Sequence, residues 1–275
     1  MKENSLYYKT RLFFSDLKSF FYEVFLQYIN RNNDIDSLIR NRIKKKFHHP
    51  KRIFVIGNGP SINKQNLEFL KDEFTICANS FFLKFKDISW KPTIYVVEDS
   101  LSLQCAKKYI ETDHLSLKIL PYSLKKNLIE NNSMVFLNFR KKYLPEFFAN
   151  WPFFSNRISS ICFWGGTVSY FSLQIAAHFK PKEIILIGTD MNYKIPESIN
   201  INGLEFKNHN PDLNHFHPDY LGHAKKWNTP NLERMQRSFN KAYKFLASHN
   251  IKLINATEGG NLKNVPRKKY CNLFN

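Results

Sequence analysis

Two glycines that flank an asparagine form the first stretch of the sequence with an evident chemical use. Residues 53–61 read IFVIGNGPS, so four apolar residues run into Gly57, Asn58 and Gly59, and Ser61 follows. Glycines at a turn between a strand and a helix allow a ligand to approach backbone N–H groups, and a serine can cap the helix. A purely structural turn would have the same residues, so both interpretations stay open.

The turn lacks the rest of a dinucleotide-binding fingerprint. No third glycine follows Gly59 before the next apolar run, and Asn79 replaces the ribose-binding acid expected about 20 residues on. An asparagine offers a donor and an acceptor together, which suits the hydroxyls of one ribose or the edge of a base. The pattern therefore favours a mononucleotide, and the lack of a GxxxxGK[ST] sequence disfavours a P-loop nucleoside triphosphatase.

Two acids and a second glycine pair could complete a binding site. Glu98 follows the run TIYVV, and Asp190 follows IILIGT. Asp190 could serve as a catalytic acid, a metal ligand, an acceptor for a sugar hydroxyl, or a structural partner of the glycine turn. Gly165, Gly166 and Thr167 start a helical pattern, where a phosphate could bind or a plain N-cap could lie.

A loop over 192–230 carries His215, His217 and His223. These histidines could bind a metal, but no further ligand has convincing spacing, so we predict no metal site. A histidine titrates near neutral pH and suits the role of general base toward a hydroxyl. Lys225, which is close to His223, could neutralise a leaving phosphate.

Alternating strand and helix patterns must position these side chains. Apolar strands and amphipathic helices alternate from residue 52 on, which predicts an α/β fold, a single Rossmann-like domain with a mainly parallel sheet covered on both faces. Because ligands of such sheets bind beyond the carboxyl ends of the strands, the polar strand ends should line one crevice. The expected strands are 52–57, 74–79, 93–99 and 182–191, with a final strand and loop over 251–260, and the expected helices are 63–72, 167–179 and 231–250.

The N-terminal part has a different pattern. Residues 5–46 carry aromatic and aliphatic side chains at helical spacing, broken near NRNND. We predict a helical, basic, amphipathic extension over 1–50 and a catalytic domain over 51–275 with a lid over about 192–230. Residues 5–52 could contact an anionic membrane, pack on the main domain, or form a homo-oligomer contact. No apolar run is long enough to span a bilayer and no signal peptide is evident, so we expect a cytoplasmic protein, peripheral at the inner membrane.

The net positive charge predicts an anionic partner. The 275 residues carry a net charge of +18, with basic clusters at 40–52 and 266–269. Nucleic acid, a nucleotide-activated substrate or an acidic membrane would each fit. Four cysteines lie far apart without CxxC spacing, which predicts reduced thiols.

Several of these stretches together resemble known families. IFVIGNGPS, CANSFF, the glycine–threonine helix start before EIILIGTDMNY, and YLGHAKK look like the family 42 glycosyltransferases, bacterial sialyltransferases that use CMP-sialic acid. They are equally similar to the family that includes the central domain of motility accessory factors and the archaeal 6-hydroxymethylpterin diphosphokinases. HFHPDYLG and INATEGG are closest to that second group. The resemblance covers about residues 52 to 270.

The resemblance implies roles for individual residues. Asn58 and Asn79 would contact the nucleotide, Tyr193 would steady the leaving phosphate, His223 would be the general base, and no cofactor or metal would be essential. Glu98 or Asp99 stands where the family has a third asparagine, and FWGGT lacks the arginine and serine expected before the helix. We assign catalytic roles to His223, Tyr193 and Asp190, and donor-binding roles to Gly57, Asn58, Gly59, Ser61, Asn79, Glu98, Gly165, Gly166, Thr167, Tyr220 and Lys225.

These residues predict an inverting glycosyltransferase. It would move a sialic-acid-like nonulosonate from a CMP-activated donor to a glycan acceptor in lipooligosaccharide, capsule or glycoprotein. One alternative is a pterin diphosphokinase-like enzyme, which would move pyrophosphate from ATP with magnesium held by acids such as Asp190 and Glu98. A non-catalytic nucleic-acid binder is the other alternative, but it leaves the glycine turns and histidines without a use, so no nucleic acid is expected.

Overall fold

A seven-stranded parallel sheet is the centre of the structure. The computed structural model describes residues 35–141, 151–194, 212–222 and 226–274, the backbone of 205–207, and the single residues Thr10, Phe14, Phe21 and Phe25. The sheet order is β11-β8-β1-β2-β3-β4-β5, and every pair in it is parallel. The strands are β1 Arg52–Ile56, β2 Phe74–Ala78, β3 Ile94–Val96, β4 Leu117–Pro121, β5 Met134–Leu137, β8 Glu183–Ile187 and β11 Lys252–Asn255.

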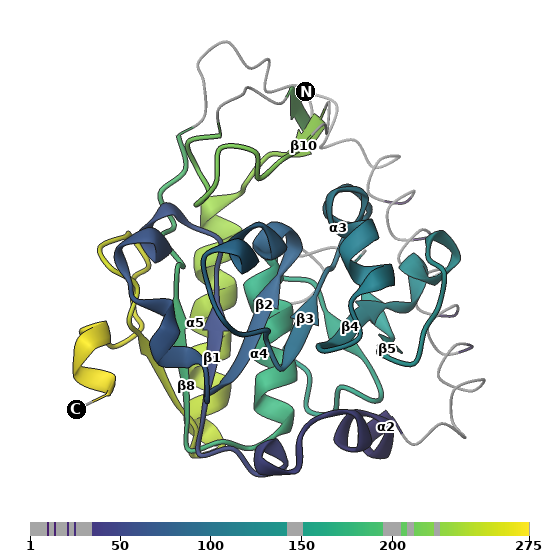
Figure 1. Cartoon of the computed structure of the whole chain (residues 1–275), viewed down its shortest axis with the longest axis horizontal. Helices are drawn as coiled ribbons and strands as arrows, with labels where there is room; N and C mark the ends of the chain where they lie inside the picture. Colours follow the sequence, from purple (N-terminus) through teal and green to yellow (C-terminus); the bar gives the residue numbers. More distant parts are fainter. Residues whose placement is uncertain are drawn as a thin grey trace.

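Helices cover both faces of this sheet (Figure 1). Alternate strand residues point to opposite sides: Ile53 and Val55 join the core shared with α2, α4 and α5, whereas Phe54 and Ile56 join the core shared with α3 and the short 3-10 turns. The predicted α/β fold with a mainly parallel, doubly covered sheet is therefore confirmed. The helices are α2 Ile35–Arg42, α3 Ser100–Thr112, α4 Val168–His178 and α5 Leu232–Ser248.

The order of the strands reverses once, between β1 and β8. The chain adds β2, β3, β4 and β5 in sequence on one side of β1, then returns to add β8 and β11 on the other side. Neighbouring loops diverge to opposite faces at such a reversal and leave a crevice beyond the carboxyl ends of the strands. The turn after β1 and the loop after β8 thus lie where a ligand site is expected.

Smaller elements complete the described chain. Two short sheets pair β6 Phe139–Arg140 with β7 Cys162–Phe163, and β9 Glu205–Lys207 with β10 Lys226–Asn228. The 3-10 turns are η2 Lys45–Phe47, η3 Pro60–Lys64, η4 Leu67–Leu70, η5 Asn79–Lys86, η6 Tyr122–Asn127 and η8 Tyr270–Leu273.

The helix predicted over 63–72 is wrong. Gln65 adopts an extended conformation, with φ −112° and ψ 136°, which ends η3. The Asn66 side chain then accepts a hydrogen bond from the Glu68 N–H and starts η4. Asparagine competes with helical hydrogen bonds in this way and favours caps over helix interiors. Two single turns therefore replace one helix.

Part of the predicted N-terminal extension belongs to the main core. Ile35, Ile39, Ile43 and Phe47 are buried in the same cluster as one face of the sheet. Phe14, Phe21 and Phe25 are helical and exposed. The other residues before 35 lie outside the described residues, so membrane or oligomer contact through 5–52 stays a prediction.

Two further sequence predictions concern membrane-spanning segments and the cysteines. No helix among the described residues is long and apolar enough to cross a membrane. All four cysteines are free.

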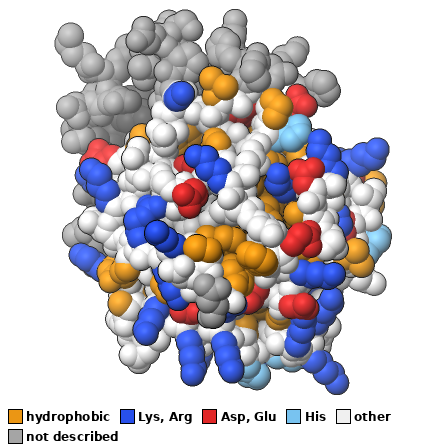
Figure 2. Space-filling model, turned by 60° about the vertical axis from the view of Figure 1, so that its left-hand side comes forward, with side chains coloured by type: hydrophobic (Ala, Val, Ile, Leu, Met, Phe, Trp, Pro, Cys, Tyr) orange, Lys and Arg blue, Asp and Glu red, His pale blue; other side chains and the backbone are white. Residues whose placement is uncertain are grey.

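On the face shown in Figure 2, Lys and Arg side chains are spread among acidic ones and around an apolar group, and they form no single basic stripe on that face.

The packing of α2 predicts a contrast between two neighbouring residues. Ile39 is fully buried, whereas Leu38 is 36% exposed. Ile39→Ala should lower the free energy of unfolding by about 2–5 kcal/mol, because it removes buried methyl groups and leaves a cavity. Leu38→Ala should change it by less than about 0.5 kcal/mol. Urea unfolding of both variants measures this, and equal effects would mean that α2 is not part of the core.

Candidate functional site

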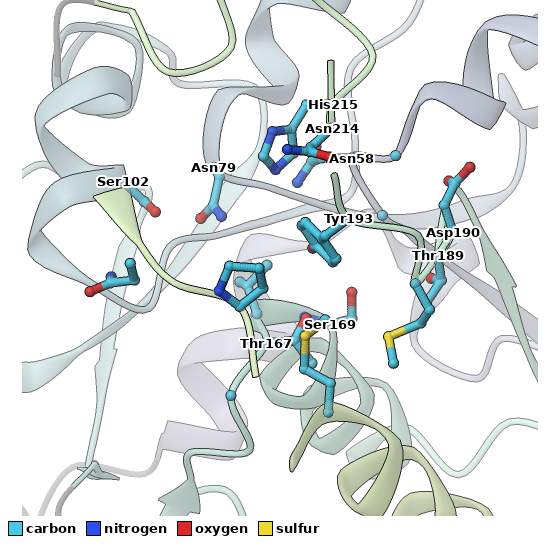
Figure 3. Close-up of a pocket in the computed structure, with 18 of the residues that line it drawn as sticks. Asn58, Asn79, Ser102, Thr167, Ser169, Thr189, Asp190, Tyr193, Asn214 and His215 are labelled. Carbon is cyan, nitrogen blue, oxygen red and sulfur yellow. The ribbon is translucent and has the colours of Figure 1, made fainter. Parts of the chain in front are cut away.

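One cavity of about 370 Å³ lies beyond the carboxyl ends of β1, β2, β3 and β8 (Figure 3). The start of α4, the 212–221 segment and the chain around the start of α5 complete its wall. The polar strand ends that the sequence singled out thus meet at one place, as the parallel topology requires. The predicted site residues that line the cavity are Gly57, Asn58, Gly59, Asn79, Glu98, Gly166, Thr167, Asp190, Tyr193 and Tyr220.

The glycines after β1 make room for the β8 loop. The N–H of Gly57 donates to the Ile187 carbonyl at 2.7 Å, and that of Gly59 donates to the Gly188 carbonyl at 2.9 Å. A Cβ on Gly57 would lie 2.3 Å from the Gly188 oxygen, which is far inside contact distance. Protein carbonyls therefore occupy the N–H groups of both glycines, as in the purely structural turn that the sequence left open.

Asp190 is held by the same turn. Its carboxylate accepts hydrogen bonds from the Ser61 hydroxyl at 2.7 Å and from the Ser61 N–H at 3.3 Å. Figure 3 shows the Asp190 carboxylate directed away from the other labelled side chains. The sequence left several roles open for Asp190, and the structure shows it as a structural partner of the glycine turn. Ser61 holds Asp190 and makes no side-chain cap, so the predicted helix cap is wrong.

Two buried asparagines flank the cavity. Asn58 and Asn79 are each 8% exposed, and the side-chain oxygen of each has no hydrogen-bond partner among the described residues. Asn79 has a positive φ of 55°, and its backbone carbonyl accepts a hydrogen bond from the Tyr95 hydroxyl. An unpaired buried amide oxygen costs free energy, so these atoms favour a ligand that brings N–H or O–H donors.

Glu98 has an unusual charge state. It is 8% exposed, and burial, followed by repulsion from Asp99, raises its pKa to about 8; attraction by Lys141 and a hydrogen bond from Trp164 oppose the shift. Asp99 is fixed as the cap of α3, where it accepts hydrogen bonds from the N–H groups of Leu101 and Ser102. Glu98 is thus mainly a neutral acid at pH 7, able to donate as well as accept a hydrogen bond.

The start of α4 forms the wall opposite the histidine loop (Figure 3). The Thr167 hydroxyl caps the helix by accepting from the Ser169 N–H. Gly166, at φ 82°, lies against Arg234, whose guanidinium is 4.7 Å from the Trp164 ring centre. Arg234 lines the cavity and was missed in the sequence, because only the fold brings α5 to this place.

Gly165 does not line the cavity. Its carbonyl accepts a hydrogen bond from the Ser238 hydroxyl at 2.7 Å. A Cβ at this position would lie 2.4 Å from the Tyr170 ring. The glycine is therefore needed for packing between α4 and α5, and its predicted donor-binding role has no support in this position.

The 212–222 segment is anchored to the core. The Phe216 N–H donates to the Asn58 carbonyl at 3.0 Å, and the Asn63 side chain donates to the Phe216 carbonyl at 2.8 Å. Phe216, Tyr220 and Leu221 are buried. This part of the predicted lid is thus part of the cavity wall. His223 and Lys225 lie outside the described residues, so their predicted roles are untested.

A histidine other than His223 lines the cavity. His215 Nδ1 lies 2.7 Å from Asp212 Oδ2, and its ring stacks on Tyr220 with centroids 3.8 Å apart. The sequence singled out His215 as one of three loop histidines and overlooked Asp212. The spacing of three residues between Asp212 and His215 was the signal in the sequence that could have indicated this pair.

Both cavity tyrosines are neutral phenols. Burial raises the pKa of Tyr193 to about 12, and nearby Asp190 and Asp212 add to the shift. Burial also raises the pKa of Tyr220, while a hydrogen bond from Asn79 acts in the opposite direction. Each hydroxyl therefore keeps its proton at neutral pH and can donate a hydrogen bond.

The described residues hold no group of three or more His, Cys, Asp and Glu side chains that could bind a metal ion. The prediction concerning metal stays a prediction, since part of the histidine loop lies outside those residues.

Comparison with known proteins gives one family. Residues 25–196, more than half of the chain, match the family described as 6-hydroxymethylpterin diphosphokinase MptE-like. No curated protein matches the chain.

Two solved structures align with the chain. The MAf glycosyltransferase from Magnetospirillum magneticum AMB-1 is 12% identical, with a TM-score of 0.49; the alignment covers 86% of this chain and 38% of that one. A mammalian sialyltransferase in complex with Gal-beta-1-3GalNAc-ortho-nitrophenol is also 12% identical, with a TM-score of 0.38, and 86% of that chain is covered by 89% of this one. Neither alignment bears on function, and this chain spans little more than a third of the first protein.

The raised pKa of Glu98 predicts a pH-dependent stability. Below the usual pKa of 4.5, native and unfolded states both hold the proton. As the pH rises above 4.5, the unfolded state releases it first, so wild-type protein loses stability until the native carboxyl also ionises near pH 8. Glu98→Gln cannot ionise and should gain stability over wild type across this range, by a few kcal/mol (order of magnitude).

Thermal unfolding of both proteins between pH 5 and pH 9 measures this difference. Glu258→Gln, which alters an exposed glutamate, is the matched control and should follow the wild-type curve. A Glu98→Gln curve parallel to that of wild type would show that Glu98 is ionised throughout.

Proposed function

The chain belongs to the 6-hydroxymethylpterin diphosphokinase MptE-like family, and from this premise we propose that it transfers a sugar from a nucleotide-activated donor to an acceptor hydroxyl. Transfer of pyrophosphate from ATP is the competing reaction. Both need a nucleotide site, and the cavity beside β1 and β8 has the size and the lining of one. The hydrogen bonds of Asp190, one of two acids in the cavity wall, favour sugar transfer over the competing reaction.

Transfer from ATP relies on magnesium, which carboxylates hold between phosphate oxygens. The two acids that the diphosphokinase alternative needs are Asp190 and Glu98. Ser61 holds the Asp190 carboxylate with two hydrogen bonds, and the raised pKa keeps Glu98 mainly neutral at pH 7. The two hydrogen bonds from Ser61 tie Asp190 to the glycine turn, and this geometry supports sugar transfer better than magnesium-dependent chemistry.

The donor that we propose is a CMP-activated, sialic-acid-like nonulosonate. The amides of Asn58 and Asn79 offer donors and acceptors for a ribose or a base edge. The neutral Tyr193 hydroxyl can donate to a phosphate oxygen as negative charge develops there. The N-terminus of α4, capped by Thr167, adds a favourable dipole at the same wall.

The reaction that we propose inverts the anomeric carbon. The acceptor oxygen attacks as the bond to the CMP phosphate breaks through an oxocarbenium-like state, and a base removes the acceptor proton. The acceptor would be a surface glycan, reached from the membrane side if residues 5–52 contact lipid. The assignment of the base to His223 and of phosphate contact to Lys225 stays a prediction.

Nucleotide binding tests the proposed donor class. CMP should raise the melting temperature, because a ligand at 100 times its Kd adds about 2.7 kcal/mol to the stability of the folded state. UDP, GDP and ATP are the matched comparisons, each with and without magnesium. Stabilisation by ATP with magnesium but not by CMP would favour the diphosphokinase instead. Transfer from a CMP-sugar that persists in EDTA would support the metal-independent reaction.

Tyr193→Phe tests the leaving-group contact. The variant removes one hydrogen bond that forms mainly in the transition state, so kcat should fall about 10- to 100-fold while the KM for donor changes little. Tyr243→Phe alters a partly buried tyrosine that packs against the core from α5 and should leave kcat unchanged. An unchanged kcat in Tyr193→Phe would remove Tyr193 from the mechanism.

A further inference from the structure

The 212–222 segment carries a histidine and a carboxylate in the arrangement of a catalytic pair. His215 lines the cavity, and its Nδ1 lies 2.7 Å from Asp212 Oδ2. The His215 side chain is 11% exposed and that of Asp212 is 3% exposed. Water therefore screens this contact weakly.

The carboxylate is fixed before any ligand binds. Asp212 Oδ1 accepts a hydrogen bond from the Asn214 N–H at 2.7 Å, and the Asp212 N–H donates to the Pro218 carbonyl at 3.1 Å. With Asp212 fixed, the proton of the neutral imidazole belongs on Nδ1, which donates to Asp212. Nε2 then keeps its lone pair and can accept a proton.

The plane of the imidazole is fixed as well. The ring stacks on Tyr220, with centroids 3.8 Å apart and an interplanar angle of 9°, and Tyr220 is 1% exposed. The next residue, Phe216, is tied by its N–H to the Asn58 carbonyl. Figure 3 accordingly shows His215 beside Asn58 and Asn214 at one end of the cavity. The pair is thus held against the turn that follows β1.

We propose that His215 is the general base of this site and that Asp212 is its positioning residue; His223, which lies outside the described residues, is the competing candidate. This inference rests on the proposed sugar transfer. His215 Nε2 takes the proton of the acceptor hydroxyl as the acceptor oxygen forms its bond to the anomeric carbon. The bond from that carbon to the phosphate oxygen breaks, and its electron pair leaves with CMP. The imidazolium, paired with the Asp212 carboxylate, later returns the proton to water.

Alanine variants of the loop histidines test the assignment. His215→Ala should lower kcat by about 10²- to 10⁴-fold, the usual contribution of a general base, while CMP affinity stays nearly unchanged. Added imidazole should restore part of the activity by occupying the space against Tyr220. His217→Ala is the matched control, because His217 is in the same loop and accepts from the Asp219 N–H but is not part of the cavity wall.

Asp212→Asn tests the positioning role. The asparagine amide can donate to Nδ1 and so favours the tautomer whose Nε2 carries the proton, which cannot act as a base. kcat should fall while the KM for donor is unchanged, a split that simple loosening of the loop would not produce. If His215→Ala does not fold, His215→Gln keeps a side chain that can donate to Asp212 and replaces it in the assay.

Each failure has a distinct signature. Wild-type turnover together with full activity in His215→Ala would overturn the base assignment alone. Loss of transfer in His223→Ala with retained transfer in His215→Ala would return the role to His223. A wild-type protein that binds CMP but transfers sugar from no CMP-sugar would overturn the proposed function, and the base role with it.

Discussion

The close contact between the turn after β1 and the loop after β8 fixes the geometry of everything around it. Hydrogen bonds from Gly57 and Gly59 to the β8 loop join the two segments, and no Cβ fits at either glycine. This contact lies where the strand order reverses, so it closes the floor of the crevice that the topology opens. Asp190 is pulled against Ser61 as a result, and Asn58 is left at the cavity wall.

The rest of the site follows from the position of Asn58. Its carbonyl holds Phe216, and Phe216 holds the loop that carries His215. On the other side of the cavity, Glu98 follows β3 in a buried place next to Asp99, and burial, followed by repulsion from Asp99, raises its pKa to about 8. The site thus combines a rigid turn, an anchored histidine loop and an acid with a raised pKa.

The sequence predicts the sheet better than it predicts the site. Buried parallel strands are continuous apolar runs, so β1, β2, β3, β8 and β11 were evident. β4 was missed because Lys118 interrupts its apolar run, and only the fold supplies the buried partner, Asp113. The prediction that the polar strand ends line one crevice followed from the parallel topology. The resemblance to the MptE-like group is confirmed.

What the sequence could not give depends on contacts between distant residues. The sequence left a ligand-binding turn and a purely structural turn open, and the β8 loop occupies the N–H groups of Gly57 and Gly59. Asp190 and Ser61 were assigned separately, although they bind each other. The histidine loop offered three candidates of the same type. Of the two that the structure describes, His215 lines the cavity and contacts Asp212, whereas His217 does not line it.

The bond between the Asn58 carbonyl and the Phe216 N–H has a consequence for how this protein can change over evolutionary time. In the proposed mechanism, nucleotide recognition and proton transfer share one short piece of backbone, so a substitution that reshapes the turn would alter both at once. Glu98, by contrast, receives a hydrogen bond from Trp164, which lies outside the histidine loop. New donor preferences should therefore arise at Glu98 far more readily than at the turn, because only there can one property drift while the other is conserved.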